Sequence, residues 1–429
     1  MKRIATVFLA VIAVTSIAAA EAEVTNVVAR QRWPWSPVVD IDFTVKGSNT
    51  YVKFTGQYDG VEPFALAEKY LEGDFCSELK PGLHHVTWDP VSAGFGSAEF
   101  KNFRVKVEAD IDHTYLILNL TDGSFSYAAE EPVGGWTSDP AYYQTNIVFR
   151  RIKAGSATLG IDKTFYTTVF PGIKSGFSST YNYTTPHNVT LTSDFYIGVF
   201  PVTKAQKYLA EQHLLGNTPN VSTYDAVIPD SGTSYDDLRG TTNNLDGVDS
   251  GIDWPNTKYA VREGSLISAF RSICADTFPE EWKIDLPTVV QWEYAARADT
   301  PTNQLWSVGG LVTDSGATLT NYLDRIATWK HNQSGNPNSM VGTKLPNKWG
   351  LYDMIGLCTE WNLDWQSNDP KYYRGTNPVG PTSAKYRSRR SCGKTNDLDQ
   401  KTVPAFIGTN GSTSQQYFRL CIHLKSLFD

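Results

Sequence analysis

The chain has 429 residues, of which 41% are hydrophobic, 19% are charged and 13% are aromatic. This length exceeds what one ordinary core supports, so we expect two domains. The net charge of -7, without a basic block, argues against nucleic acid or an anionic membrane as a partner. The histidines are scattered, and no two of them have the helical spacing of a metal motif.

Residues 1–20 contain the three parts of a signal peptide in order. A basic start at 1–3 precedes an apolar run at 4–17, and small residues follow at 18–20. The apolar run is shorter than the roughly twenty residues that span a bilayer, so a retained anchor is the weaker alternative. We therefore expect export to the periplasm, the cell surface or the medium, with no membrane span after cleavage.

Residues 21–122 have the pattern of a small, Ig-like β-sandwich. Short runs with period-two alternation recur between Gly, Asn and Asp residues, as at 39–45, 83–89, 103–107 and 115–118. We expect Trp88 to fill the core of this sandwich. The neighbours His84 and His85 point to opposite faces of a strand, so we expect surface or edge positions rather than metal ligands.

A short aromatic segment, Trp33-Pro34-Trp35, is open to two interpretations. The indoles form either a platform on which a sugar stacks or the packed entry to the first strand. The second interpretation is favoured here.

Residues 123–146 contain paired glycines, prolines and aromatics, which predicts a linker that wraps onto its neighbours. After the linker, residues 147–429 contain few long periodic segments. Threonines at 203 and 288 are each followed three residues later by Gln, the spacing of a capping box, so we expect helices there. A third helix is expected at 265–274, where apolar residues share one face.

The segment 347–365, NKWGLYDMIGLCTEWNLDW, is dense in Gly and Trp. Glycines allow positive φ and close backbone approach, and tryptophans need large pockets, so this segment is a tightly specified, turn-rich structure. It holds the carboxylate of Glu360 between a Cys-Thr pair and Trp361.

Landmarks of residues 147–429 resemble, in order, the formylglycine-generating enzyme (sulfatase-modifying factor) family. They lie at 154–160, 195–203, 286–297, 349–361, 377–381 and 417–420. The resemblance implies an α+β protein in which the sandwich precedes a variant of the C-type lectin fold. That second domain has few short helices and much irregular structure.

The same resemblance implies an oxidase in which two cysteines bind Cu(I), since a soft ion needs soft ligands. In the family they follow an Arg-Gly-Gly-Ser-aromatic strand. The matching segment here, 386–394, has Cys392 at a glycine position, and residues 395–410 contain no cysteine. Copper is therefore not expected. Cys392 and Cys421 form a displaced copper pair in one alternative, and are buried thiols or a disulfide in the favoured one.

The chain has three further cysteines, Cys76, Cys274 and Cys358, which makes five. An odd number cannot pair fully within one chain, so at least one thiol is unpaired or intermolecular.

Calcium is also implied by the resemblance. The positions of this chain that match the family's calcium ligands are the side chain of Asn321, the carbonyl of Tyr322 and the carboxylate of Glu360. Leu357 and Thr359 replace residues that the family has at the second site, one of them a ligand Asn. Two roles are thus open for Glu360: a calcium ligand, or a buried carboxylate that accepts hydrogen bonds from backbone N–H groups.

Two classes of function follow. In the favoured class the chain is a noncatalytic, exported member that binds a glycan, a peptide or a protein. In the alternative it is a formylglycine-generating oxidase with a relocated thiol pair.

Overall fold

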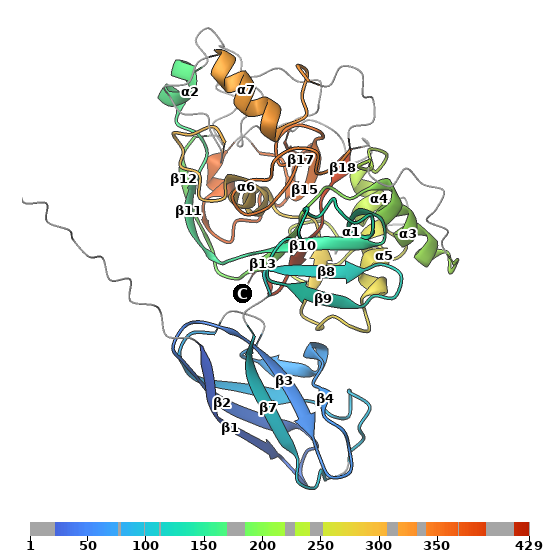
Figure 1. The fold of residues 1–429 in the computed structure, drawn as a ribbon. Helices are drawn as coiled ribbons and strands as arrows, with labels where there is room; N and C mark the ends of the chain where they lie inside the picture. Colours follow the sequence, from blue (N-terminus) through green and yellow to red (C-terminus); the bar gives the residue numbers. More distant parts are fainter. Residues whose placement is uncertain are drawn as a thin grey trace, which may run out of the picture. The chain divides into compact units, whose positions relative to one another are not determined.

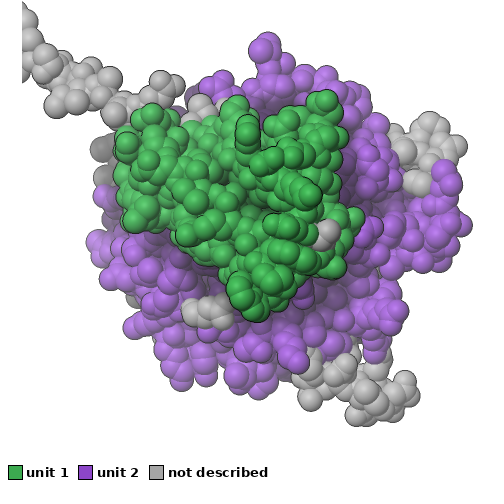
Figure 2. Space-filling model, turned by 90° about the horizontal axis from the view of Figure 1, so that it is seen from below, with its two compact units in different colours: residues 1–111 green, residues 112–429 purple. Residues whose placement is uncertain are grey.

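The computed structural model describes residues 22–75, 79–97, 99–110, 113–169, 185–218, 228–240, 252–306, 316–332, 340–367, 369–391 and 416–428. The predicted signal peptide, Cys76 and Cys392 lie outside these ranges. The chain divides into two compact units, residues 1–111 and 112–429, which Figure 2 draws in separate colours. Among the described residues, no helix combines the length and the apolar character that a membrane crossing requires.

Unit 1 is a sandwich of two antiparallel sheets around one core (Figure 1). Strand β2 alternates as predicted, because Val39, Ile41 and Phe43 are buried while the residues between them are partly exposed. Trp88 is fully buried in this core, which confirms its expected position. The first sheet has the strand order β1 (Glu23–Gln31), β2 (Val39–Lys46), β6 (Gly82–Trp88), β5 (Leu71–Gly73). The second sheet has the strand order β4 (Phe64–Ala65), β3 (Tyr51–Gln57), β7 (Arg104–Asp110).

The paired histidines lie on β6 and contact different carboxylates. His84 is half-buried and lies 3.4 Å from Asp74, whereas the exposed His85 contacts Asp42 at 2.8 Å. The two side chains point to opposite faces, as the strand alternation predicted: His84 stacks on the core residue Phe43, and only His85 has the expected surface position.

Unit 2 begins earlier than the sequence pattern suggested. Strand β8 (Tyr115–Asn119), which the alternation placed in the sandwich, pairs with β10 (Asn146–Ile152) of unit 2. The segment 123–146, predicted as a linker, contains β9 (Phe125–Ala128) and α1 (Ala141–Gln144), and β9 pairs with β8. These assignments were wrong because alternation shows that a strand is half-buried, but it does not show which sheet that strand joins.

The described residues of unit 2 form an α+β structure with one six-stranded sheet and two three-stranded sheets. Figure 1 shows the helices around these sheets. The six-stranded order is β14 (Lys283–Asp285), β19 (Cys421–His423), β13 (Phe195–Gly198), β10, β8, β9. One smaller sheet has the order β11 (Gly155–Leu159), β12 (His187–Leu191), β16 (Gly375–Thr376). The other has the order β17 (Arg387–Arg390), β15 (Glu360–Trp365), β18 (Tyr417–Phe418).

Short helices pack around these sheets, and three of them begin where the sequence predicted, two from capping boxes and one from its apolar face. Thr203 and Thr288 each form a complete capping box with the Gln three residues later, and Ser265 caps α5. Helix α6 contacts β15 and β17. The remaining bounds are α2 (Lys163–Val169), α3 (Lys204–Leu214), α4 (Tyr235–Arg239), α5 (Leu266–Ile273), α6 (Val289–Arg297) and α7 (Gly316–Ile326), with short 3-10 turns at Glu68–Tyr70 and Pro370–Tyr373.

The segment 347–365 is turn-rich up to residue 359, as its composition predicted, but its last residues form the strand β15, which was not predicted. Gly350 and Gly356 both have φ of 78°. A Cβ atom would collide with the Tyr115 hydroxyl at Gly350 and with the Thr328 carbonyl at Gly356. Only glycine combines this backbone conformation with so close an approach.

Candidate functional site

The first residue of β15, Glu360, forms a buried ion pair with Arg419. The Nη2 atom of Arg419 donates to Oε1 at 2.9 Å and its Nε donates to Oε2 at 3.1 Å. The same guanidinium also donates to the carbonyls of Gly198, Val199 and Tyr352, at 2.7 to 2.9 Å. All five N–H donors of Arg419 are therefore used, and the pair joins three distant segments of unit 2.

The second oxygen of Glu360 has one more donor, the indole N–H of Trp292, at 2.7 Å. Both side chains are fully buried. The carboxylate is thus buried and hydrogen-bonded, but its donors are side chains rather than the backbone N–H groups that were expected. A guanidinium and an indole on its two oxygens do not fit a calcium ligand, because the cation would have to displace a paired positive charge.

The other two predicted calcium ligands lie on α7. The side chain of Asn321 is on an exposed face of this helix, while Tyr322 packs partly against the apolar core. By helix geometry the carbonyl of Tyr322 accepts the N–H of Ile326 within α7. Within the described residues, no group of three or more His, Cys, Asp and Glu side chains is placed to hold a metal ion. The calcium assignment stays a prediction.

A second buried carboxylate, Glu293 on α6, lies between two arginines. It accepts from Arg297 Nε at 2.9 Å, from Arg390 Nη2 at 2.9 Å and from the backbone N–H of Gly160 at 2.8 Å. Burial alone would raise the pKa of Glu293, but the charges of Arg390 and Arg297 outweigh it and lower this pKa to about 2. Glu293 therefore stays ionised and ties α6 to β17 and to the turn after β11.

The described cysteines are buried thiols. Cys421 is fully buried on β19, where its residue pairs with Ile197 of β13 and Asp285 of β14. Burial raises the pKa of the Cys421 thiol well above its ordinary value, and burial raises that of Cys274 to about 12. Cys392 lies outside the described residues, so the predicted Cys392–Cys421 pair does too.

Sequence reasoning missed a buried polar cluster on β15, next to Glu360. Asp364 is fully buried and accepts the N–H of Val289 at 2.6 Å through Oδ2, while its Oδ1 has no partner among the described residues. Burial raises the pKa of Asp364 to about 7. Both polar atoms of the Asn362 side chain likewise lack partners within the described ranges. The pairing of β15 with β17 is irregular between Trp361 and Trp365, so alternation along the sequence gave no signal for this cluster.

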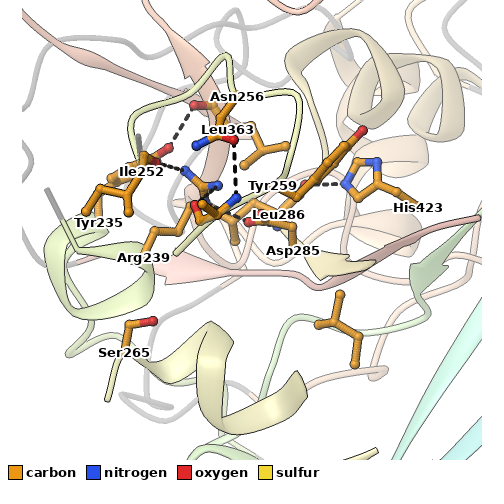
Figure 3. Close-up of polar contacts among 12 residues, drawn as sticks. Tyr235, Arg239, Ile252, Asn256, Tyr259, Ser265, Asp285, Leu286, Leu363 and His423 are labelled. Carbon is orange, nitrogen blue, oxygen red and sulfur yellow. Dashed lines mark hydrogen bonds and ion pairs between the residues drawn. The ribbon is translucent and has the colours of Figure 1, made fainter. Parts of the chain in front are cut away.

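A third polar network supports a surface cavity of unit 2. Asp285 pairs with two arginines, Arg239 at 2.9 Å and Arg271 at 3.0 Å. Arg239 also donates to the Ile252 carbonyl (Figure 3). His423 contacts the Leu286 carbonyl in the same region, and burial lowers the pKa of its imidazole to about 4.

The cavity itself has a volume of about 310 Å³ and opens beside α5 and β14. Its lining is mixed, with cationic and apolar side chains together. Lys258, Arg271, Cys274, Phe278, Trp282 and Lys283 are among the lining residues. A concave, partly apolar site with a few charged groups is the usual form of a ligand pocket.

Comparison with known proteins identifies the family. Residues 143–409 match the family model described as "Sulfatase-modifying factor enzyme 1-like domain". This match spans more than half of the chain, so the chain belongs to that family.

Individual relatives are more distant. The chain is 30% identical to the formylglycine-generating enzyme of Mus musculus over 107 residues. The aligned stretch covers 24% of this chain and 28% of that protein. It is 26% identical over 208 residues to "Chaperone protein LppX" of Paenibacillus barcinonensis, covering 42% and 65%. The chain thus spans under a third of the first relative's length.

Two solved structures show similarity over 65% of this chain. Treponema denticola variable protein 1 has 21% identity and a TM-score of 0.43, with 95% of that chain covered. PvdO from Pseudomonas aeruginosa has 17% identity and a TM-score of 0.42, with 94% of that chain covered.

Proposed function

We propose that this chain is an exported, ligand-binding member of the sulfatase-modifying factor family that does not carry out the copper oxidation. The observation that carries the proposal is the state of Cys421. Cu(I) is held by thiolates, and this thiol is buried inside a sheet with a pKa well above its ordinary value.

Three further observations support a binding role. The chemistry-bearing residues of the family landmarks, Glu293 and Glu360, are each engaged by buried arginines, so they act as cross-links of the fold. The cavity beside α5 offers a concave site of the size that small ligands or peptide side chains occupy. The name of one relative, a chaperone protein, is compatible with binding rather than oxidation.

An oxidase assay tests the proposal directly. The mature chain is incubated with Cu(I), O₂ and a peptide containing Cys-x-Pro-x-Arg, and aldehyde formation is followed by mass spectrometry. We expect no aldehyde above a copper-only control. Aldehyde that disappears in both Cys392→Ser and Cys421→Ser would establish the relocated thiol pair and end the noncatalytic proposal.

Ligand identity and location need separate tests. Peptide and glycan arrays with the mature chain are expected to give a hit that weakens when Lys258 or Lys283 is changed to Ala. Fractionation of cells that express the full chain tests export, and we expect a product shortened near residue 20 outside the cytoplasm.

For calcium, a melting temperature that is the same in EDTA and in saturating calcium would remove the assignment of Asn321 and Tyr322.

A further inference from the structure

The loop between β1 and β2 of unit 1 exposes two tryptophans. Trp35 is 90% exposed and Trp33 is 40% exposed. An indole normally contributes a large buried area to a core or an interface, so single exposed apolar residues are common but two indoles on one short loop are not. The interpretation of this segment as a packed strand entry is therefore wrong for Trp35.

The loop is held in one conformation by bonds at its base. The backbone N–H of Arg32 donates to the Val38 carbonyl at 2.9 Å, and the N–H groups of Trp35 and Ser36 both donate to the Arg32 carbonyl at 3.1 Å. The guanidinium of Arg32 binds Asp40 through two hydrogen bonds, at 2.8 and 3.0 Å. A loop fixed in this way loses little entropy when its tip binds a ligand.

A row of polar side chains continues from the loop across the open face of the sheet. Asp40 and Asp42 alternate with the buried residues of β2, so both face outward. Arg30 contacts Asp42 at 2.8 Å, and His85 lies 2.8 Å from Asp42 and 3.5 Å from Asp40. Hydrogen bonds from Arg32 to Asp40, and from His85 to Asp42, lower the pKa of each carboxyl.

These charges cancel within the row, since two arginines face two aspartates. Nucleic acids and anionic lipids require an excess of positive charge, which this face lacks. The core of a protein interface is depleted in charged residues, whereas this face is built from them. The ligand class that fits this neutral, hydrogen-bonding face and its exposed indoles has no net charge, many hydroxyl groups and flat apolar surfaces.

We propose that the Trp33–Trp35 loop and the adjoining row of Arg30, Arg32, Asp40, Asp42 and His85 bind a neutral glycan. The apolar C–H face of a sugar ring stacks on the indole of Trp35, and the next rings place their hydroxyls against the carboxylates and guanidinium groups. This site lies in unit 1, outside the matched family domain, and is independent of the function proposed for unit 2.

The test uses the mature chain and defined probes: the hexasaccharides of cellulose, xylan, mannan and chitin. Binding is measured by calorimetry and by the change in tryptophan fluorescence. We expect at least one probe to bind, and Trp35→Ala to raise its Kd by about tenfold or more. Since Trp35 is almost fully exposed, this variant should keep the melting temperature of the parent.

Val133→Ala is the matched control, because Val133 is a fully exposed apolar residue of unit 2 and is not part of the proposed site. It should leave the Kd unchanged. Binding should also be insensitive to sodium chloride, as expected for an uncharged ligand. The proposal is overturned if none of the four probes binds, if Trp35→Ala binds as well as Val133→Ala, or if affinity falls steeply with salt.

Discussion

Glu293 and Asp364 are both fully buried carboxylates of unit 2, yet they have opposite electrostatic character. Glu293 has two arginines and a backbone N–H as donors, and its pKa is lowered to about 2. Asp364 accepts the backbone N–H of Val289, and burial raises its pKa to about 7. The first is ionised at any physiological pH, whereas the second titrates near neutrality.

The difference shows that burial by itself does not set the state of an acid. Burial raises the pKa of both groups, and only direct pairing with guanidinium groups reverses this effect. Glu293 is therefore a charged cross-link, while Asp364 is the described residue of β15 best placed to respond to pH.

The largest effect is expected from Glu293→Gln. The substitution leaves the charges of Arg297 and Arg390 buried without their counter-ion, so we expect the free energy of unfolding to fall by about 3 to 5 kcal/mol at pH 7. Urea unfolding measures it. Glu263→Gln, at an exposed glutamate, is the control and should change stability by less than about 0.5 kcal/mol. Similar values for the two variants would show that the cross-link contributes nothing.

The lowered pKa of Glu293 also sets how the stability of the fold depends on pH. Glu293 has a folded pKa of about 2 against an ordinary 4.5, so its stabilisation is present above pH 4.5 and is lost as the pH falls toward 2. In Glu293→Gln this acid limb of the stability profile should be flatter than in the parent.

Asp364→Asn should act in the opposite direction. The folded pKa is about 7 against an ordinary 3.8, so the ionised group destabilises the fold as the pH rises from 3.8 to 7. The variant should therefore be more stable than the parent at pH 8, by on the order of 2 to 4 kcal/mol, and close to it at pH 4. Asp276→Asn, at an exposed position, should show no such difference. A variant that is less stable at pH 8 would contradict the raised pKa.

A smaller gain is expected from Asn362→Leu. The amide has no partner within the described part of unit 2, and an apolar side chain of similar size removes that desolvation cost, so stability should rise by about 1 to 2 kcal/mol. Thermal unfolding by calorimetry measures the change. Asn362→Ala separates the loss of polar groups from the loss of volume. A clear destabilisation by Leu would mean that this amide bonds to a segment outside the described ranges.

The smallest effect concerns the start of α6, which positions both acids. Thr288→Ala removes the side-chain acceptor for the Gln291 N–H, at 3.1 Å, and should cost about 1 kcal/mol of unfolding free energy. Thr288→Ser keeps the acceptor and should retain most of the stability. Chemical denaturation of the two variants side by side checks the prediction.

Several local features were predictable because they depend on neighbours in the chain. The capping boxes at Thr203 and Thr288, the alternation of β2 and the glycine turns at Gly350 and Gly356 involve short-range sterics and hydrogen bonds. The family landmarks were also readable from sequence, and the family match confirms them.

The partners of the buried charges were not predictable in this way. Glu360 and Arg419 are 59 residues apart, and Glu293 and Arg390 are 97 apart, so no local pattern couples them. The same limit explains the wrong placement of β8, whose partner β10 lies beyond a segment that was predicted as a linker.

The sequence by itself determined the family, the starts of α3, α5 and α6, the alternation of β2 and the turn-rich character of residues 347–359, because each depends on residue type and short spacing. The tertiary structure alone decided that Glu360 binds an arginine, that Asp364 has no such partner among the described residues and that Trp35 is exposed. Those outcomes depend on which distant groups share a low-dielectric interior or a surface, and long-range packing sets that arrangement.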